Sequence, residues 1–372
     1  MKKVLFVAHV ESHILHFHIP YLKMFHEKGY EVHVATNGSS MIPFCDVKYN
    51  LPFQKSPLKK ENYIAFKEMK IILDTEVFEI IHCHTPVGGV IARLANRLSI
   101  NYKNTRMIYT AHGFHFYKGA PLSNWIIYYP IERWMAKYTD ILITINHEDY
   151  ERAKKFRFKQ NGSVEFVHGV GINEDKFKFP LNKIEREKLR QAIGLQRDDF
   201  VMIFPAELNH NKNQILLIKV MEQITKNHNN IKLLLLGKDL LSGEYKNEIK
   251  RRNLENNIKV LGYRNDVPKL IKISDIGISS CIREGLGLNL IEELYCGLPV
   301  IASSNRGHKE IVQKNTNGLL YDLNEIHVLE SLILKCYNKE IVFEQDILKK
   351  SVEKFLIRNV QEEYRKIYFR EG

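Results

Sequence analysis

The chain has 372 residues, of which 44% are hydrophobic and 26% are charged, and its formal net charge is +12. This length predicts two domains of ordinary size rather than a single core, and no apolar run approaches the roughly 18 to 20 residues that span a bilayer. The positive charge is spread along the chain without interleaved aromatic residues, which argues against a nucleic-acid partner.

The cysteines are widely spaced and include no C-x-x-C pair; they are Cys45, Cys83, Cys281, Cys296 and Cys336. An odd number of cysteines without such a pair predicts neither a disulfide framework nor a zinc site. The cytoplasm is therefore the expected compartment.

Short aliphatic runs alternate with helical patterns through the first half of the chain. Strands are predicted at 4–8, 31–35, 80–83, 107–111, 141–145 and 164–168, and helices at 21–28, 87–98 and 124–137. This alternation is typical of a parallel, doubly wound α/β sheet.

The same alternation begins again in the second half. Strands are predicted at 200–204, 232–236, 258–261, 276–280 and 300–302, with helices starting near residues 213, 243, 267 and 288. Two successive halves predict two Rossmann-like domains, 1–168 and 169–352, followed by a charged helical segment at about 353–372. Ligands of open α/β sheets bind beyond the carboxyl ends of the strands, so a cleft between the two halves is the expected site.

The most informative stretch places Glu284 and Glu292 on either side of Gly285 and Gly287, at a predicted junction of strand and helix. A helix start offers unpaired backbone N–H groups and a positive dipole end to an anion, and glycine lets the main chain come close to it. The expected anion is a diphosphate. Because carboxylates do not bind this anion, the two glutamates are expected to accept hydrogen bonds from hydroxyls on either side of it, as a nucleotide-linked sugar provides.

This stretch resembles the E-x7-E signature of the retaining glycosyltransferases of family 4. The match covers Glu284, Gly285, Gly287, Glu292 and 296–301, whereas Asn289 and Glu293 stand where the family often has proline and alanine. The resemblance implies the GT-B fold, with the closing helix crossing back onto the first domain. It also implies transfer of a hexose from a nucleotide diphosphate sugar, with UDP expected, with retention of configuration and without a metal or other cofactor.

The resemblance also implies roles for individual residues. Glu284 would bind the donor sugar and Glu292 the ribose, while Leu286 and Leu288 belong to the same donor-binding loop. The leaving phosphate would help to deprotonate the acceptor hydroxyl.

A second segment matches the family at Lys212, where a lysine neutralises the donor diphosphate. Glu207 stands where the family has an arginine, which reverses a charge. Arg283, Lys238 or Arg264 is expected to replace that arginine as a charge-assisted donor. Arg283 is preferred because it already lies beside the glycine loop.

Twelve of the 16 histidines precede residue 170. His112 follows the predicted strand 107–111 and matches a family histidine that contacts the donor sugar, which makes it and Glu284 the catalytic candidates. A structural imidazole is the alternative for His112. His13, His16 and His115 are weaker candidates on the acceptor side.

No metal site is expected among these histidines. His13, His16 and His18 do not share a clean ligand spacing, although His82 and His84 would point to the same side of a strand.

The acceptor is expected to be a lipid-linked saccharide in capsule or exopolysaccharide assembly. A basic segment with Lys55, Lys59, Lys60, Lys67 and Lys70 favours an anionic membrane surface, and the aromatic stretch 125–129 would suit the same setting. A solvated helix face and ordinary core packing are the respective alternatives. The expected location is the cytoplasm, with peripheral contact at the inner face of the cell membrane.

Two other functions compete with the transferase. A nucleotide-sugar epimerase would share the two-domain architecture and a diphosphate site. A non-catalytic basic protein that binds nucleic acid or membrane would explain the charge, but it would leave residues 283–301 without a role.

Overall fold

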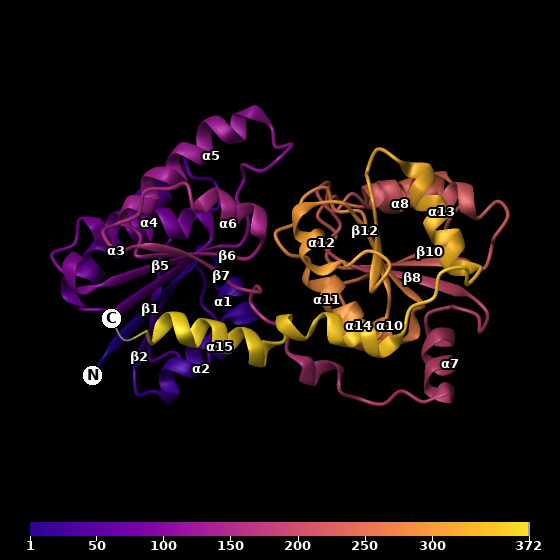
Figure 1. Cartoon of the computed structure of the whole chain (residues 1–372), viewed down its shortest axis with the longest axis horizontal. Coiled ribbons are helices and arrows are strands. Elements are labelled where there is room, and N and C mark those ends of the chain that lie inside the picture. Colours follow the sequence, from indigo (N-terminus) through magenta and orange to yellow (C-terminus); the bar gives the residue numbers. More distant parts are fainter. Residues whose placement is uncertain (371–372) are drawn as a thin grey trace. The chain divides into compact units, whose positions relative to one another are not determined.

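The computed structural model describes residues 1–370 and divides the chain into two units (Figure 1). The first unit contains Met1–Gly171 together with the chain from Val360 onward, and the second contains Ile172–Asn359. Within residues 1–370, none of the helices has both the length and the apolar character needed to cross a membrane.

The first unit is built on a seven-stranded parallel sheet with the order β3-β2-β1-β4-β5-β6-β7. Its strands are β1 (Lys3–Val7), β2 (Glu31–Thr36), β3 (Val47–Asn50), β4 (Ile80–His84), β5 (Arg106–Ala111), β6 (Ile141–Thr144) and β7 (Ser163–Phe166). Its helices are α1 (Glu11–Phe17), α2 (Ile19–Glu27), α3 (Lys60–Thr75), α4 (Pro86–Arg97), α5 (Leu122–Met135), α6 (His147–Ala153) and most of α15 (Ile357–Tyr368).

Alternate residues of β1 face opposite sides of this sheet. Leu5 and Val7 are buried in the core that α3, α4 and α6 cover. Phe6 points to the other side, where its ring meets Phe25 of α2 at a centroid distance of 5.8 Å. The helix α15 packs on this second side, since Tyr364 meets Tyr21 of α2 at 4.7 Å.

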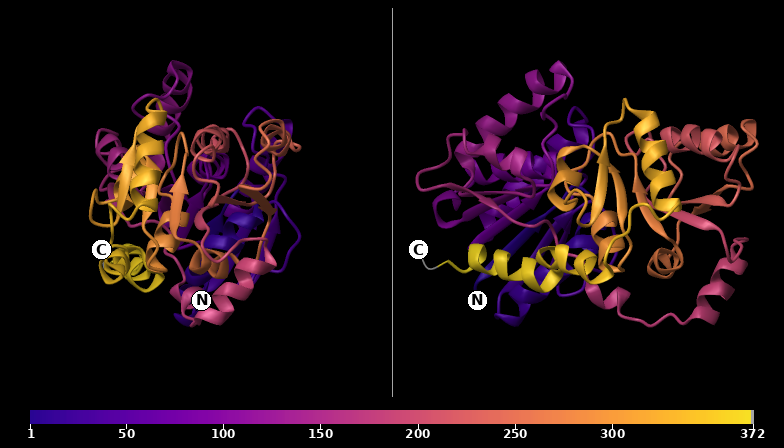
Figure 2. Two further views of the ribbon diagram at one scale, coloured as in Figure 1. Left: turned by 90° about the vertical axis from the view of Figure 1, so that its right-hand side faces the viewer. Right: turned by 45° about the vertical axis from the view of Figure 1, so that its right-hand side comes forward.

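The second unit has a six-stranded parallel sheet with the order β10-β9-β8-β11-β12-β13, and helices cover both of its faces (Figure 2). Its strands are β8 (Phe200–Pro205), β9 (Ile231–Leu236), β10 (Ile258–Gly262), β11 (Ile276–Ser279), β12 (Val300–Ser303) and β13 (Gly318–Tyr321). Its helices are α7 (Lys183–Ala192), α8 (Gln214–Ile224), α9 (Glu244–Arg251), α10 (Val267–Ile273), α11 (Leu288–Tyr295), α12 (Arg306–Ile311), α13 (Ile326–Tyr337) and α14 (Gln345–Ser351). Short 3-10 helices occur at Tyr102–Asn104, Ala136–Tyr138, Glu174–Phe177 and Glu353–Phe355.

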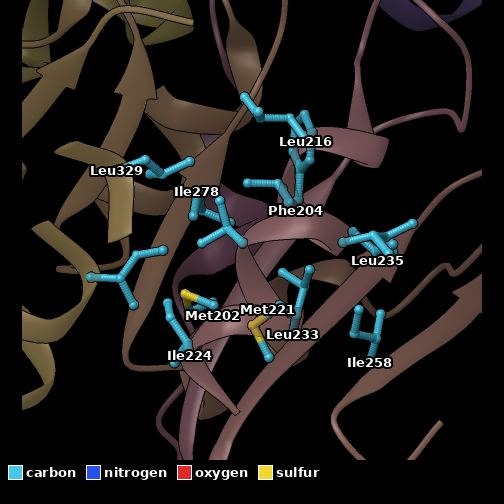
Figure 3. Packing of buried hydrophobic residues seen from close by; sticks show 14 of the residues in the cluster. Met202, Phe204, Leu216, Met221, Ile224, Leu233, Leu235, Ile258, Ile278 and Leu329 are labelled. Carbon is cyan, nitrogen blue, oxygen red and sulfur yellow. The ribbon is translucent and has the colours of Figure 1, made fainter. Parts of the chain in front are cut away.

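The core of the second unit lies on both faces of its sheet. Met202 and Phe204 of β8 pack with Leu216 and Met221 of α8 on one face (Figure 3). Val201 and Ile203 of the same strand pack with α7 and α10 on the other face. A rigid parallel sheet of this kind fixes the loops at the carboxyl ends of its strands.

Every predicted strand and helix of the two halves is present, with ends within two residues of the prediction. The edge strands β3 and β13 were not predicted. The expected domain boundary falls at 168/169, and the structure divides the chain after Gly171. Of the expected closing segment, residues 371–372 lie outside the described residues.

Candidate active site

The carboxyl edge of the second sheet brings Lys212 and Glu284 into contact. Lys212 lies in the loop after β8, and Glu284 lies in the loop after β11, the strand next to β8. The Lys212 Nζ is 2.6 Å from Glu284 Oε2, and the two side chains are 21% and 22% exposed. The Cys281 thiol donates a further hydrogen bond of 3.2 Å to the same carboxylate oxygen.

Each partner of this ion pair holds the other in its charged form. Burial alone would lower the pKa of Lys212, but attraction to the Glu284 carboxylate outweighs burial and raises that pKa. Burial would likewise raise the pKa of Glu284, but the Lys212 ammonium outweighs it and lowers that pKa. The pair therefore stays ionised at neutral pH, and the other N–H groups of the ammonium remain available as donors.

The backbone of the two loops is held together by hydrogen bonds. The Asn211 side chain donates to Arg283 O at 2.9 Å, and the Ile282 N–H donates to Asn211 O at 2.8 Å. The Ser280 hydroxyl contacts the backbone oxygens of Lys212 and Asn213, each at 2.9 Å. Arg283 thus lies in a loop whose main chain is fixed to the Lys212 loop.

Glycine is required where this loop enters α11. Gly287 is the N-cap residue with a φ of +89°, in the left-handed region, and no side chain caps the helix there. The first backbone N–H groups of α11 point out of the start of the helix, and the helix itself provides no acceptor for them. This arrangement is suited to an anion.

Gly307 of α12 lies against the loop that carries Glu284. A Cβ atom at Gly307 would lie 2.7 Å from Glu284 O and from Leu286 N. The glycine therefore allows α12 to support the loop from behind. Its neighbour His308 is buried, donates from Nδ1 to Ser303 O at 2.8 Å, and has its pKa lowered by burial to about 4.

The two glutamates of α11, Glu292 and Glu293, have different surroundings. Burial raises the pKa of Glu292 to about 7, and Lys176 opposes this shift. Glu293 is fully buried, and burial raises the pKa of its carboxyl well above the usual range. A Cβ atom at Gly277 would lie 2.1 Å from Glu293 Oε2, so this glycine provides the space for the residue that replaces the family alanine.

The other predicted donor-side residues follow neighbouring strands at the same edge. Lys238 is exposed after β9, and Glu207 is exposed after β8. Arg264, after β10, makes two hydrogen bonds of 2.7 and 2.6 Å to the carboxylate of Asp266. Its guanidinium is thus engaged by Asp266. Arg283 lies in the loop that carries Glu284.

The first unit brings two of its predicted residues together at the carboxyl edge of its own sheet. The ring of His112, directly after β5, meets the ring of His13 of α1 edge-on at 4.7 Å. Burial lowers the pKa of His112 to about 4 and that of His13 to about 2. His16 is exposed, with Nδ1 2.5 Å from Ser12 O, and His115 stacks on Tyr128 at 4.5 Å.

Two buried histidines of this region were not selected as site residues. His18 stacks on His84 of β4 at 3.8 Å, and His84 Nδ1 is 3.4 Å from His112 Nε2. One ring nitrogen from each of His13, His18 and His112 lies within 4.8 Å of the other two, a grouping that could hold a metal ion. Linear spacing did not reveal this grouping, because His112 comes from a distant segment.

Comparison with known proteins gives the family of this chain. The family model of group 1 glycosyl transferases matches residues 185–354, and that of glycosyl transferase 4-like proteins matches residues 3–146. A Bacillus subtilis (strain 168) protein named as glycosyltransferase EpsD is 41% identical over 338 residues, which cover 91% of this chain and 88% of that protein.

Two further relatives extend the comparison. The Escherichia coli UDP-Gal:alpha-D-GlcNAc-diphosphoundecaprenol alpha-1,3-galactosyltransferase is 27% identical over 300 residues, covering 77% of this chain and 75% of that protein. The crystal structure of Anabaena Alr3699/HepE in complex with UDP and glucose matches with a TM-score of 0.77 and 18% identity over 99% of both chains, which shows a shared fold. The family assignment decides for a transferase over the epimerase and the non-catalytic alternatives. The chain belongs to the glycosyltransferases of group 1 and family 4 type, and its two parallel α/β units form the GT-B fold.

Proposed function

We propose that this glycosyltransferase moves a hexose from UDP-hexose to a hydroxyl of a lipid-linked saccharide, with retention of configuration and with no metal ion at the diphosphate. The observation that carries the donor side is the Lys212–Glu284 pair at 2.6 Å beside the uncapped start of α11. It combines a cation and backbone N–H groups for a diphosphate with a carboxylate for a sugar hydroxyl.

The leaving diphosphate is stabilised by positive charge from the protein. Lys212, Arg283 and the N-terminus of α11 supply the charge that a divalent cation would otherwise provide. Arg283→Ala is expected to weaken UDP binding more than uridine binding, because uridine lacks the diphosphate. Equal losses for both ligands, measured by titration calorimetry, would contradict this role.

The glutamates bind hydroxyls on either side of the diphosphate. Glu284 binds the donor sugar, and Glu292 binds the ribose. With a pKa of about 7, the Glu292 carboxyl is largely ionised only at mildly basic pH. From the family resemblance we assign His112 to the donor sugar.

The reaction breaks the bond between the anomeric carbon and the diphosphate oxygen and forms a bond from that carbon to the acceptor oxygen. The acceptor proton passes to the leaving phosphate on the same face. This route conserves the anomeric configuration and releases UDP. UDP and a polyprenol-linked acceptor are the ligands named for the Escherichia coli relative, and UDP is also the nucleotide of the Anabaena complex.

A lipid-linked acceptor calls for a surface that meets a membrane, and α5 presents one. Its solvent side exposes five large apolar residues, which are Leu122, Ile126, Ile127, Ile131 and Trp134. Leu122 is 72% exposed and Ile126 is 66% exposed. Three exposed cationic residues, Lys118, Arg133 and Lys137, lie in α5 or close to it in the sequence. We propose that this face contacts an anionic membrane.

The acidic residue within α5 does not oppose this contact. Glu132 is buried, and its carboxylate forms an ion pair of 3.0 Å with Arg93. The predicted aromatic stretch therefore has two roles: Trp125 and Tyr129 pack towards Phe116, whereas the isoleucines between them face solvent.

The basic segment at 55–70 is a weaker candidate for the same role. The helix α3 begins only at Lys60, and Met69 is buried in the core. Acidic residues alternate with its lysines, and Lys70 pairs with Asp74 at 2.5 Å.

Vesicle co-sedimentation tests the membrane contact. Burying one isoleucine contributes about 1.5 to 3 kcal/mol, so Ile126→Asp with Ile127→Asp should reduce binding to anionic phospholipid vesicles at least tenfold. Ile184→Asp with Val342→Asp is the matched control, because these two residues are 66% and 78% exposed in the second unit. Equal binding by both variants would rule out α5 as the contact.

Donor binding tests the central proposal. UDP is expected to raise the melting temperature of the wild type more than GDP or ADP, and UDP-hexose should be slowly hydrolysed. Glu284→Ala should lose hydrolysis and Glu292→Ala should bind UDP more weakly, whereas Glu255→Ala, at an exposed acid of the same unit, should behave as wild type. Absence of nucleotide binding, or wild-type behaviour of both site variants, would refute the proposal.

A further inference from the structure

Three histidines meet beyond the carboxyl edge of the first sheet, and they come from separate parts of the chain. His13 lies in α1, His18 directly follows α1, and His112 directly follows β5. We propose that these three side chains form a binding site for one divalent transition-metal ion, with Zn²⁺ as the ion that fits best.

The separation of the ring nitrogens fits a common metal ligand sphere. One nitrogen from each ring lies within 4.8 Å of the other two, and His18 Nε2 is 3.2 Å from His13 Nδ1. Two nitrogens bound to one tetrahedral Zn²⁺ at about 2.05 Å are about 3.4 Å apart. One pair is thus already at ligand spacing, and the third ring needs only a small adjustment.

Not every ring nitrogen in this group of histidines has a hydrogen-bond partner among the described residues. A neutral imidazole has one donor and one acceptor nitrogen. His18 Nδ1 and His84 Nε2 are buried and have no hydrogen-bond partner within residues 1–370. His18 is therefore not held by hydrogen bonds at both of its nitrogens, and its Nε2, which faces His13 Nδ1 at 3.2 Å, is the nitrogen that would bind an ion.

His82 shows what a purely structural histidine looks like in the same place. Its Nδ1 is 2.7 Å from the Tyr368 hydroxyl, and its Nε2 is 2.8 Å from Thr110 Oγ1. Both nitrogens are therefore used within the fold. His82 belongs to the packing of α15, and His18 does not follow this pattern.

The donor set selects the kind of metal. The grouping consists of imidazoles alone. Imidazole suits zinc, copper and nickel, whereas magnesium and calcium prefer oxygen ligands. Three histidines also leave a fourth tetrahedral position open. His84 lies behind the set, with its Nδ1 at 3.4 Å from His112 Nε2, and helps to orient that ring.

Metal binding at this site would inhibit sugar transfer, an inference that rests on the proposed function. His112 is the residue assigned to the donor sugar. A metal ion on its ring nitrogen would occupy the lone pair that the sugar needs, so Zn²⁺ should inhibit transfer even though the diphosphate needs no metal.

The test uses the full chain without an affinity tag, stripped with a chelator and titrated with Co²⁺. One Co²⁺ per chain should bind with the absorption of a tetrahedral complex, and Zn²⁺ should displace it. His13→Ala, His18→Asn and His112→Ala should each weaken binding at least tenfold. His16→Ala is the matched control, because His16 is exposed on the same helix and should bind as wild type.

Circular dichroism checks that each variant is folded, and the partly exposed His13 keeps the test valid if His18→Asn does not fold. Failure to bind one Co²⁺, or an equal loss in His16→Ala, would overturn the site. Metal binding without any UDP binding would refute the proposed function and leave the site intact. Metal binding without Zn²⁺ inhibition would overturn only the inhibition.

Discussion

Replacing Lys212 by methionine measures what the central ion pair contributes to the second unit. The change keeps an apolar chain of similar length but leaves the Glu284 carboxylate without its partner at 2.6 Å. Removing one member of a buried pair costs about 3 to 5 kcal/mol, whereas an exposed pair is worth about 0 to 1 kcal/mol. Because the two side chains are 21% and 22% exposed, we expect an intermediate loss of about 2 to 3 kcal/mol in the free energy of unfolding at about pH 8.

The pH dependence of this loss has a definite sign. In the wild type Lys212 lowers the pKa of Glu284, so the glutamate stabilises the fold above its unfolded pKa and that contribution disappears as the pH falls. In Lys212→Met the burial of Glu284 is opposed only by the Cys281 hydrogen bond and by His308, so the pKa shift should reverse and make the ionised form destabilising. The difference between wild type and variant should therefore be larger at about pH 8 than at about pH 5.

The chain provides an internal control for the assay. Both tryptophans, Trp125 and Trp134, lie in the first unit. Urea unfolding followed by circular dichroism should show the loss, while the transition seen by tryptophan fluorescence should not move. Lys178→Met removes an exposed pair of the second unit and should change stability by less than about 0.5 kcal/mol.

Adding Glu284→Gln to Lys212→Met should recover most of the loss, because no buried charge then remains. A loss of stability in Lys212→Met no larger than that in Lys178→Met would contradict this contribution of the ion pair. A loss that does not grow with pH would contradict it as well.

Three other measurements follow from the same unit. Burial raises the pKa of Glu293, so the wild type should lose stability as the pH rises above the pKa of this carboxyl in the unfolded chain. Glu293→Gln should therefore melt at a higher temperature than the wild type at about pH 8, and its melting temperature should depend less on pH. Gly307→Ala places a Cβ 2.7 Å from Glu284 O and Leu286 N, so UDP affinity measured by calorimetry should fall at least about tenfold while the far-ultraviolet spectrum is retained. UDP affinity should rise with pH around the Glu292 pKa of about 7, and an unchanged slope in Glu292→Gln would exclude that carboxyl as the cause.

The alternation of strands and helices could be predicted because buried parallel strands form continuous aliphatic runs. The strand β3 contradicts that pattern: its sequence Val47–Asn50 contains a lysine and an asparagine, and it lies partly exposed at the sheet edge. The strand β13 has only four residues and also lies at an edge. Edge strands carry weaker patterns because only part of their surface is buried.

Site residues could be predicted one at a time, but their contacts could not. Lys212 and Glu284 are 72 residues apart, and they meet because β8 and β11 are neighbours in the sheet. The histidines meet for the same reason, since β1, β4 and β5 are adjacent. Strand order depends on the topology of the crossovers, which a local sequence pattern does not contain.

The glutamate at position 207, where the family has an arginine, changes what the other residues of the proposed donor site must supply. Glu207 is exposed where the family has an arginine, and the Lys212 ammonium is already bonded to Glu284. A diphosphate that binds here must share that ammonium with the carboxylate, so Lys212 neutralises less of its charge than an unpaired lysine would. Under the proposed function, the balance is supplied by Arg283 and by the N–H groups at the start of α11, whose positions depend on the loop that Gly307 supports. If the donor binds as proposed, precise backbone placement replaces the missing cation, and a shift of this loop should weaken donor binding more than it would in a relative that has the arginine.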